Sequence, residues 1–219
     1  FYGDATLIDS TAFAGFVDFL ETSFPLVFSR LDVTYVNDYG VLVKWPGSDA
    51  SLMPFLLMAH SDVVPADAEK WTHPPFQGMV KDGFIWGRGT MDNKGNLLAI
   101  MEAAEMLLAE GYAPKQTVYL AFGHDEEVTG KYGAASIVEH LQKENVKLDF
   151  VLDEGLVITK DIPGMKVPLA LVGVGEKGYL SLELSVEMES GHSAMPPSNT
   201  AIGISVSYTH LRAHETSEN

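Results

Sequence analysis

Residues 54–62 read Pro-Phe-Leu-Leu-Met-Ala-His-Ser-Asp, an apolar run that ends in an imidazole and a carboxylate. A short apolar run between a proline and polar residues predicts a buried strand. The runs at 117–122 and 150–152 have the same character and predict two more strands. Apolar residues at helical spacing predict a helix over 97–108, and a second helix is predicted over 134–143. Strands that alternate with helices indicate an α/β fold, with a mostly parallel sheet and helices on its faces.

The sequence pattern changes near residue 176. Residues 179–188 alternate apolar and polar side chains, which predicts a strand that is buried on one face only. We therefore expect one domain over 1–175 and the beginning of a second domain, of α+β type, over 176–205. Residues 206–219 resemble one reading frame of a transposase adapter used to prepare sequencing libraries. We expect them to be a non-native tail and leave them out of the fold.

The composition of the 219 residues excludes several classes of protein. Lys and Arg number 14 against 30 Asp and Glu, and a chain with a net charge of -16 repels the phosphate backbone of nucleic acids. The absence of cysteine excludes disulfides, a thiol nucleophile and thiolate zinc sites, so a metal must bind to His and carboxylate side chains. No uncharged apolar run approaches the ~18 residues that span a bilayer, so we expect a soluble protein without a membrane partner. The compartment stays open, with the cytoplasm slightly favoured.

Acidic residues and histidines follow each predicted strand. His-Ser-Asp at 60–62 follows the first, Gly-His-Asp-Glu-Glu at 123–127 the second, and Asp-Glu-Gly at 153–155 the third. A fourth cluster, at 87–95, precedes the long helix. In an open α/β sheet, ligands bind in the crevice outside the carboxyl ends of the strands, so these clusters should converge. They predict a metal site.

Each cluster also has a simpler explanation when it is taken alone. His60 could be a core imidazole, and Asp92 could cap the following helix. The acids at 125–127 could form a solvated loop, and 153–155 could be a turn. Four such coincidences at strand ends favour the metal site.

The spacing of the residues assigns roles within this site. On extended backbone Asp62 points the same way as His60, so it can accept the second ring N–H and fix the tautomer of a ligand. The adjacent Glu126 and Glu127 point in different directions. This suits one of them to a metal and the other to the reacting water.

The number of carboxylates indicates two metals. Asp92, Glu127 and Asp153 with one His are too many for a single catalytic zinc, so two ions that share a bridging carboxylate fit better. If Asp92 bridges, the second ion has only Asp92 and Glu127, and one ligand is missing. The positive charge of two divalent ions exceeds the negative charge of three carboxylates. The net positive charge should lower the pKa of a bridging water and so supply hydroxide near neutral pH. Glu126 would then take the proton and deliver it to the leaving nitrogen.

Four motifs now carry a resemblance to a known family. They resemble those of the M20 metallopeptidases, which are di-zinc aminoacylases and carboxypeptidases, and they occur at 60–65, 87–95, 123–128 and 190–194. Residues 71–76, Trp-Thr-His-Pro-Pro-Phe, and the motif at 123–128 look closest to the branch of carboxypeptidase S and N-acyl-amino-acid hydrolases. The resemblance covers roughly residues 30–205. It implies a zinc-peptidase-like catalytic domain over 1–175 and a lid or dimerisation domain that begins at 176.

The resemblance also implies a ligand set. His60 and Asp153 would bind one zinc ion, Glu127 the other and Asp92 both, with Glu126 as general base and Co²⁺ or Mn²⁺ as substitute metals. The bond that follows the bridging Asp is commonly cis in this family. The remaining zinc ligand of the family is a His that follows the lid, so the resemblance implies that this chain is a fragment.

Two further residues have open assignments. His192 is either a polar loop residue or, as the resemblance implies, a substrate-binding residue of the lid that polarises the scissile carbonyl, often across a homodimer. Arg88 could orient a substrate carboxylate or pair with a nearby acid, and the pairing is favoured.

The expected function is hydrolysis of a peptide or N-acyl amino acid at an amide bond next to a free carboxylate. The alternatives are a non-catalytic relative that binds a small molecule or metal, and a fragment that is itself inactive.

Overall fold

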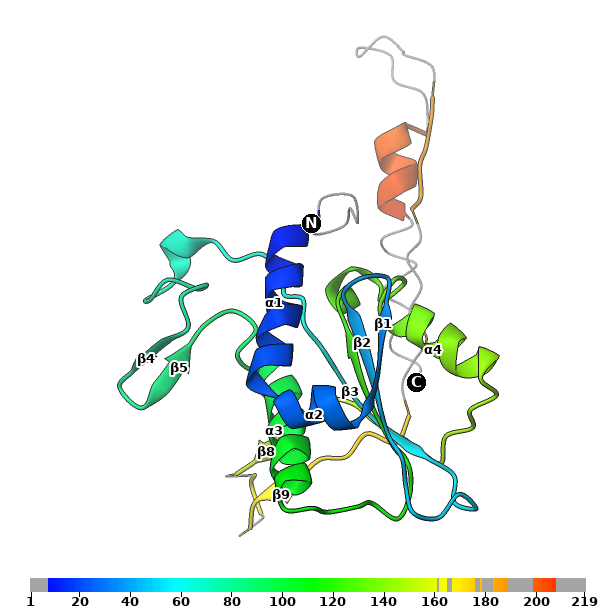
Figure 1. Ribbon diagram of the computed structural model, residues 1–219. Coiled ribbons are helices and arrows are strands. Elements are labelled where there is room, and N and C mark those ends of the chain that lie inside the picture. Colours follow the sequence, from blue (N-terminus) through cyan, green and yellow to red (C-terminus); the bar gives the residue numbers. More distant parts are fainter. Residues whose placement is uncertain are drawn as a thin grey trace. The chain divides into compact units, whose positions relative to one another are not determined.

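The computed structural model describes residues 8–160, 162–164, 167–175, 178, 183–188 and 199–207. The chain divides into two compact units, Phe1–Leu171 and Val172–Asn219. The first unit contains a central sheet with helices on its faces (Figure 1). The domain boundaries expected at 175 and 205 stay predictions.

Five strands form the central sheet. Their order is β1-β2-β6-β3-β7, with bounds Asp32–Val36, Gly40–Trp45, Val118–Gly123, Phe55–His60 and Val151–Leu152 respectively. The pairs β3–β6 and β3–β7 are parallel, whereas β1–β2 and β2–β6 are antiparallel. Within this sheet β2 therefore runs against the other four strands. The arrangement confirms the predicted α/β class with a mostly parallel sheet.

A tight turn joins β1 to β2. Its residues Asn37 and Asp38 have φ values of 49° and 68°, in the left-handed region where Asn and Asp are enriched. Such turns match the twist of an antiparallel hairpin. This hairpin was not predicted, because β1 is mostly half-buried or exposed and has no continuous apolar run.

Four helices flank the sheet, and their bounds are α1 Ser10–Ser23, α2 Pro25–Arg30, α3 Lys94–Ala109 and α4 Ala134–Lys143. α3 lies in the chain between β3 and β6, which are parallel neighbours and therefore require a crossover. α4 lies between β6 and β7, which pair with β3 on its two sides. These two helices confirm the predictions over 97–108 and 134–143. Helices α1 and α2 were not predicted.

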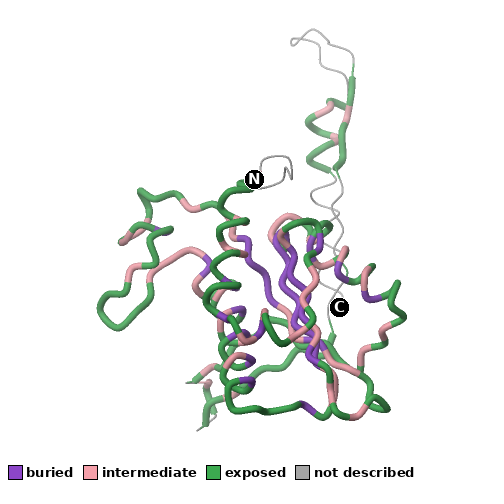
Figure 2. Tube along the Cα trace, viewed as in Figure 1, coloured by how far each residue is buried: buried purple, intermediate pink, exposed green. Residues whose placement is uncertain are grey.

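Both faces of β6 are covered. Val118, Leu120 and Phe122 belong to the core that contains side chains of α1, α2 and α3, whereas Tyr119 and Ala121 belong to the core that contains α4. All six residues of the strand are buried, and the buried positions concentrate along the central strands (Figure 2). Burial on both faces explains why β6 reads as a continuous apolar run. It also holds the carboxyl end of β6, where the acidic cluster begins, in a fixed place.

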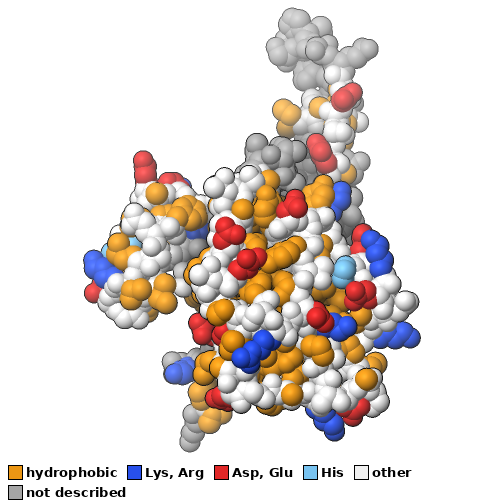
Figure 3. Space-filling model, in the orientation of Figure 1, with side chains coloured by type: hydrophobic (Ala, Val, Ile, Leu, Met, Phe, Trp, Pro, Cys, Tyr) orange, Lys and Arg blue, Asp and Glu red, His pale blue; other side chains and the backbone are white. Residues whose placement is uncertain are grey.

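A separate hairpin follows β3. It consists of β4 (Met79–Lys81) and β5 (Phe84–Trp86), and Asp82 and Gly83 between them have positive φ. Asp-Gly is a strong hairpin signal that the sequence analysis did not use. The hairpin exposes apolar side chains, seen at the left of Figure 3, including Val80, Phe84 and Ile85. A last short pair, β8 (Ile158–Thr159) and β9 (Leu169–Ala170), is antiparallel.

The strand predicted over 179–188 is wrong for its described part. Residues 183–188 form neither helix nor strand, and 179–182 lie outside the described residues. A strand requires hydrogen bonds to a neighbouring strand, which an alternating pattern does not supply. Residues 201–207 of this second unit are helical. Among the helices that the structure describes, none has the length and apolar character that crossing a membrane requires.

Candidate metal centre

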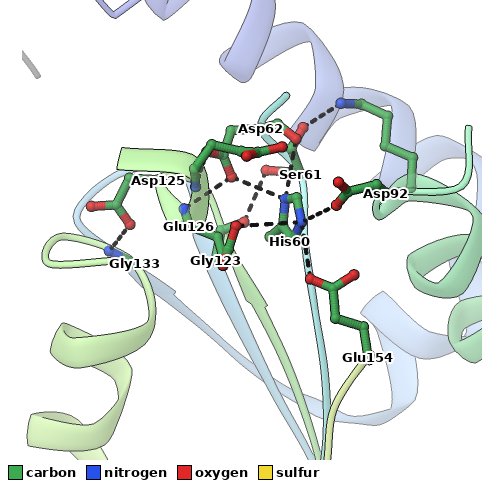
Figure 4. Close-up of polar contacts among 11 residues, drawn as sticks. His60, Ser61, Asp62, Asp92, Gly123, Asp125, Glu126, Gly133 and Glu154 are labelled. Atoms are coloured by element: carbon green, nitrogen blue, oxygen red, sulfur yellow. Dashed lines mark hydrogen bonds and ion pairs between the residues drawn. The ribbon is translucent and has the colours of Figure 1, made fainter. Parts of the chain in front are cut away.

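The site is built around His60, the last residue of β3. Its ring is only 3% exposed, and both ring nitrogens have acidic neighbours. Nδ1 lies 3.1 Å from the main-chain oxygen of Asp62 and 3.3 Å from its Oδ1. Nε2 lies 3.0 Å from Asp92 Oδ1 (Figure 4). Asp62 therefore holds one side of the ring, as its spacing from His60 predicts, and leaves Nε2 free for a ligand role.

Three carboxylates from separate parts of the chain surround Nε2 of His60. The distances are 3.0 Å to Asp92, 3.3 Å to Glu154 Oε1 and 3.7 Å to Glu126 Oε2. Two sets of potential ligand atoms each lie within 4.8 Å of one another: His60 with Asp92 and Glu127, and His60 with Glu126 and Glu154. One imidazole among carboxylates is a donor set that suits Zn²⁺, Co²⁺ or Mn²⁺. The residues present therefore fit a divalent cation.

The register of the sheet explains how these residues meet. β3 and β6 are parallel, and His60 lies opposite Gly123, so both strands end at the same edge. Ser61 donates its main-chain N–H and its hydroxyl to Gly123 O, at 2.8 and 3.1 Å. The end of β3 with the residues after it, 60–62, and the residues after β6, 124–127, are thereby brought side by side.

Asp62 also accepts hydrogen bonds from the main chain of the acidic cluster, a role that was not predicted. Its Oδ1 accepts the main-chain N–H of Glu126 at 3.1 Å, and its Oδ2 accepts that of Glu127 at 3.0 Å. Burial raises the pKa of Asp62, but the hydrogen bonds from His60 and these amides lower it more, so it lies below its usual value. Asp62 therefore joins the His60 ring to the turn η3 (Glu126–Val128) that carries two of the acids.

Asp92 enters from the start of α3. The peptide bond between Asp92 and Asn93 is cis, as the family resemblance implies. Asn93 rather than Asp92 occupies the N-cap position of α3, so helix capping does not explain Asp92. Lys94, the next residue, donates Nζ to the main-chain oxygen of Ser61. The start of α3 is thus tied directly to the end of β3.

The acidic residues of the site crowd one another. Burial lowers the pKa of His60, but its neighbouring carboxylates raise it more, to about 9. Burial raises the pKa values of Glu126, Glu127 and Glu154, and the negative charge of Asp92 raises them further. His60 lowers these pKa values, but by less than the other effects raise them. A bound cation would relieve the repulsion between these carboxylates.

Asp153 and Glu154 follow β7, and the structure places them differently. Glu154 contacts His60 and belongs to one of the two sets of potential ligands, whereas Asp153 belongs to neither. Asp153 Oδ1 accepts the main-chain N–H of Glu154 at 2.8 Å. The ligand role of Asp153 stays a prediction. Glu154 was not among the predicted ligands, because two adjacent acids can be told apart only once the direction of the chain after β7 is known.

Arg88 does not pair with an acid among the described residues, so the favoured pairing is not found there. Its main-chain N–H donates to Pro75 O at 2.7 Å, and its guanidinium carbon lies 5.2 Å from the ring centroid of Trp71. Its Nε is buried without a hydrogen-bond partner. The neighbour of the guanidinium that the structure describes is thus an aromatic ring, in a cation–π contact.

His124 remains outside the centre. His124 is buried with its ring edge-on to Tyr39 at 5.6 Å between centroids, and burial lowers its pKa. It supports the fold beside the acids and does not join either set of potential ligands. His192 lies outside the described residues.

The chain is similar in sequence to known hydrolases. Residues 56–211 match the family described as Peptidase family M20/M25/M40. The N-fatty-acyl-amino acid synthase/hydrolase PM20D1 of Xenopus tropicalis is 47% identical over 199 residues, which cover 90% of this chain and 39% of that protein. The probable carboxypeptidase S-like 2 of Dictyostelium discoideum is 45% identical over 196 residues, 88% of this chain and 38% of that protein. The chain thus spans about two fifths of the length of these relatives.

Solved structures share its fold. The M20 family metallo-carboxypeptidase Sso-CP2 of Sulfolobus solfataricus matches with a TM-score of 0.52 and 24% identity, over 66% of this chain and 32% of that chain. Human carnosine dipeptidase 1 matches with a TM-score of 0.53 and 21% identity, over 73% of this chain and 37% of that chain.

Proposed function

Because this chain belongs to peptidase family M20/M25/M40, we propose that it acts as a metal-dependent hydrolase. The bond cleaved is the amide of a peptide or of an N-acyl amino acid, next to a free carboxylate. The names of its relatives, an N-fatty-acyl-amino acid synthase/hydrolase and a probable carboxypeptidase, support this substrate class. The observation that carries the proposal is the gathering of three carboxylates within 3.7 Å of Nε2 of the buried His60.

The metal site is proposed to hold two Zn²⁺ ions, with Co²⁺ or Mn²⁺ as substitutes. His60, Asp92 and Glu127 would supply ligands. The family resemblance supports Asp153 as a further proposed ligand. A divalent cation bound by these residues would polarise a carbonyl group and lower the pKa of a bound water. Asp62 fixes the orientation of the His60 ring through Nδ1.

Glu126 is the proposed general base. Its side chain is 54% exposed and faces His60, so it can reach both the centre and a substrate. Burial and neighbouring carboxylates raise its pKa, which suits a group that exchanges protons near neutral pH. Glu126 would take a proton from water as the water oxygen attacks the carbonyl carbon. It would then give this proton to the amide nitrogen as the C–N bond breaks.

Substrate binding is proposed to involve the second unit. His192 would help to polarise the carbonyl, and the region from 176 to 205 would form part of a lid through which two copies pair. The family resemblance supports this proposal.

The variant Glu126→Gln tests the proposed function. It keeps the size of the side chain but removes the basic oxygen, so turnover should fall by about 10²–10⁴-fold. Metal content, measured by elemental analysis, should stay at the wild-type value because the proposed ligands are intact. Turnover is followed on a panel of N-acyl amino acids and dipeptides, and the exposed Glu139→Gln on α4 is the matched control. Hydrolysis close to the wild-type rate in Glu126→Gln would refute the assignment of the base.

A further inference from the structure

Asp125 is a buried acid beside the centre that the proposed reaction does not use. It is 2% exposed, and both of its carboxylate oxygens accept main-chain N–H groups. Oδ2 accepts from Tyr132 and Oδ1 from Gly133, each at 2.7 Å. Figure 4 shows its side chain directed to Gly133, away from His60. Asp125 therefore faces the start of α4 and not the metal centre.

The main chain of Asp125 closes the same loop. Its carbonyl oxygen accepts the N–H groups of Val128 at 3.2 Å and of Gly130 at 2.7 Å. Four donors from one loop thus converge on one residue. At Gly133 a Cβ would lie 2.6 Å from Asp125 Oδ1 and 2.8 Å from His124 N, so no side chain fits there. The loop from 125 to 133 is closely packed on itself.

A second carboxylate holds this loop from the other side. Asp62 accepts the N–H groups of Glu126 and Glu127, as described above. The two acids that face the centre therefore lie between two fixed points, Asp62 on the β3 side and Asp125 on the α4 side. α4 is itself anchored, because Ile137 and Leu141 are buried in the core on that face of the sheet.

We infer that Asp125 is a positioning residue for Glu126 and Glu127. Its carboxylate ties the loop that carries them to the N-terminal end of α4, where the helix dipole also favours a negative charge. The direction of both acidic side chains is then set before any ligand binds, which is the condition for a preorganised site. The inference deepens the proposed function and rests on the roles of Glu126 and Glu127 in it.

The variant Asp125→Asn tests this role in the whole chain. The amide keeps one acceptor oxygen, but its NH₂ group would face an N–H donor, so one buried hydrogen bond is lost. Amide hydrogen exchange, followed by NMR, should become at least about tenfold faster over residues 124–133. The affinity for Co²⁺, measured by titration of its visible spectrum, should fall at least about tenfold.

Glu105→Gln is the matched control. Glu105 also accepts main-chain N–H groups at the start of a helix, from Leu26 at 2.9 and 3.0 Å and from Val27 at 2.9 Å, but it serves α2. This control should lower the melting temperature without changing exchange over 124–133 or the affinity for Co²⁺. If both variants accelerate exchange over 124–133 equally, Asp125 has only a general structural role and the inference is wrong.

Wild-type protein supplies a second test, which also applies if Asp125→Asn fails to fold. The amides of Glu126, Glu127, Tyr132 and Gly133 should exchange together as one protected group, and unrelated exchange rates would overturn the inference. A wild-type chain that binds no Co²⁺ would refute the proposed metal centre, while the exchange data would still decide the role of Asp125.

Discussion

At the scale of single residues, His60 is the residue around which the acidic side chains of the site are arranged. Its two ring nitrogens face different groups, Asp62 on one side and Asp92 with Glu154 on the other. An imidazole held in this way presents one nitrogen in a fixed direction. The carboxylates near Nε2 lie where the other ligands of a bound cation would lie. The position of each acidic side chain relative to Nε2 therefore decides whether it can be a ligand.

Asp153 and Glu154 are adjacent acids that follow β7 directly. The family resemblance implies that Asp153 is the ligand, whereas Glu154 is the residue that contacts His60. We expect Asp153→Asn to lower the affinity for Zn²⁺ by about 10–100-fold, as loss of a charged partner of a metal site typically does. Isothermal titration with Zn²⁺ measures this effect.

Glu154→Gln serves as the control for Asp153→Asn. It removes the neighbouring charge and should leave the affinity for Zn²⁺ within a few-fold of wild type. The opposite result, with Glu154→Gln weakening the site and Asp153→Asn not, would transfer the ligand role to Glu154.

At the scale of secondary structure, α3 has two functions in the fold. Its first residues carry Asp92 to the centre, and Lys94 donates to the main chain at the end of β3. In its second half, Glu105 accepts the N–H groups of Leu26 and Val27 and so caps α2. Glu105 on α3 thus satisfies main-chain donors of a different helix.

Replacing Glu105 with Ala should destabilise the fold. Two main-chain donors at the start of α2 lose a charged acceptor, so we expect the free energy of unfolding to fall by about 1–3 kcal/mol. Urea unfolding measures it. Glu102→Ala, at an exposed position of the same helix, should change it by no more than about 0.5 kcal/mol. Equal effects of the two substitutions would mean that the cap contributes nothing.

At the scale of the whole molecule, the charge of the site couples the stability of the metal-free chain to pH. His60 has a pKa of about 9 in the folded chain and an ordinary value of 6.5. Between these values the folded state binds more protons than the unfolded state, so stability falls as pH rises. The contribution of His60 is fully present below pH 6.5 and is lost as pH rises through about 9.

Urea unfolding in the presence of a chelator, repeated across this pH range, tests the coupling. Added Zn²⁺ should weaken or reverse the loss, because metal binding replaces the proton on His60. The variant His60→Gln should remove the slope. A metal-free wild-type chain whose stability is flat or rises over this range would contradict the charged environment described for His60.

The parts of the fold that could be predicted are those whose sequence shows a local pattern of apolar residues. β3, β6, β7, α3 and α4 follow from apolar runs and helical spacing, and the clusters after the strands follow from the same reading. The hairpin β1–β2 and the helices α1 and α2 were missed, because their burial depends on the sheet and on Glu105. The predicted strand over 179–188 fails at 183–188, where alternation has no neighbouring strand among the described residues to pair with.

The sequence by itself determined the class of the fold and the chemical types at the site, since both depend on residue identity and short-range spacing. Tertiary structure alone decided which acids face His60. It placed Glu154 beside the ring, gave Arg88 an aromatic neighbour, and set Asp62 and Asp125 on either side of the Glu126–Glu127 turn. These contacts join residues that lie far apart in the chain or at the two ends of a loop. Their geometry follows from strand register and from the direction in which the chain leaves each strand, which no local pattern records.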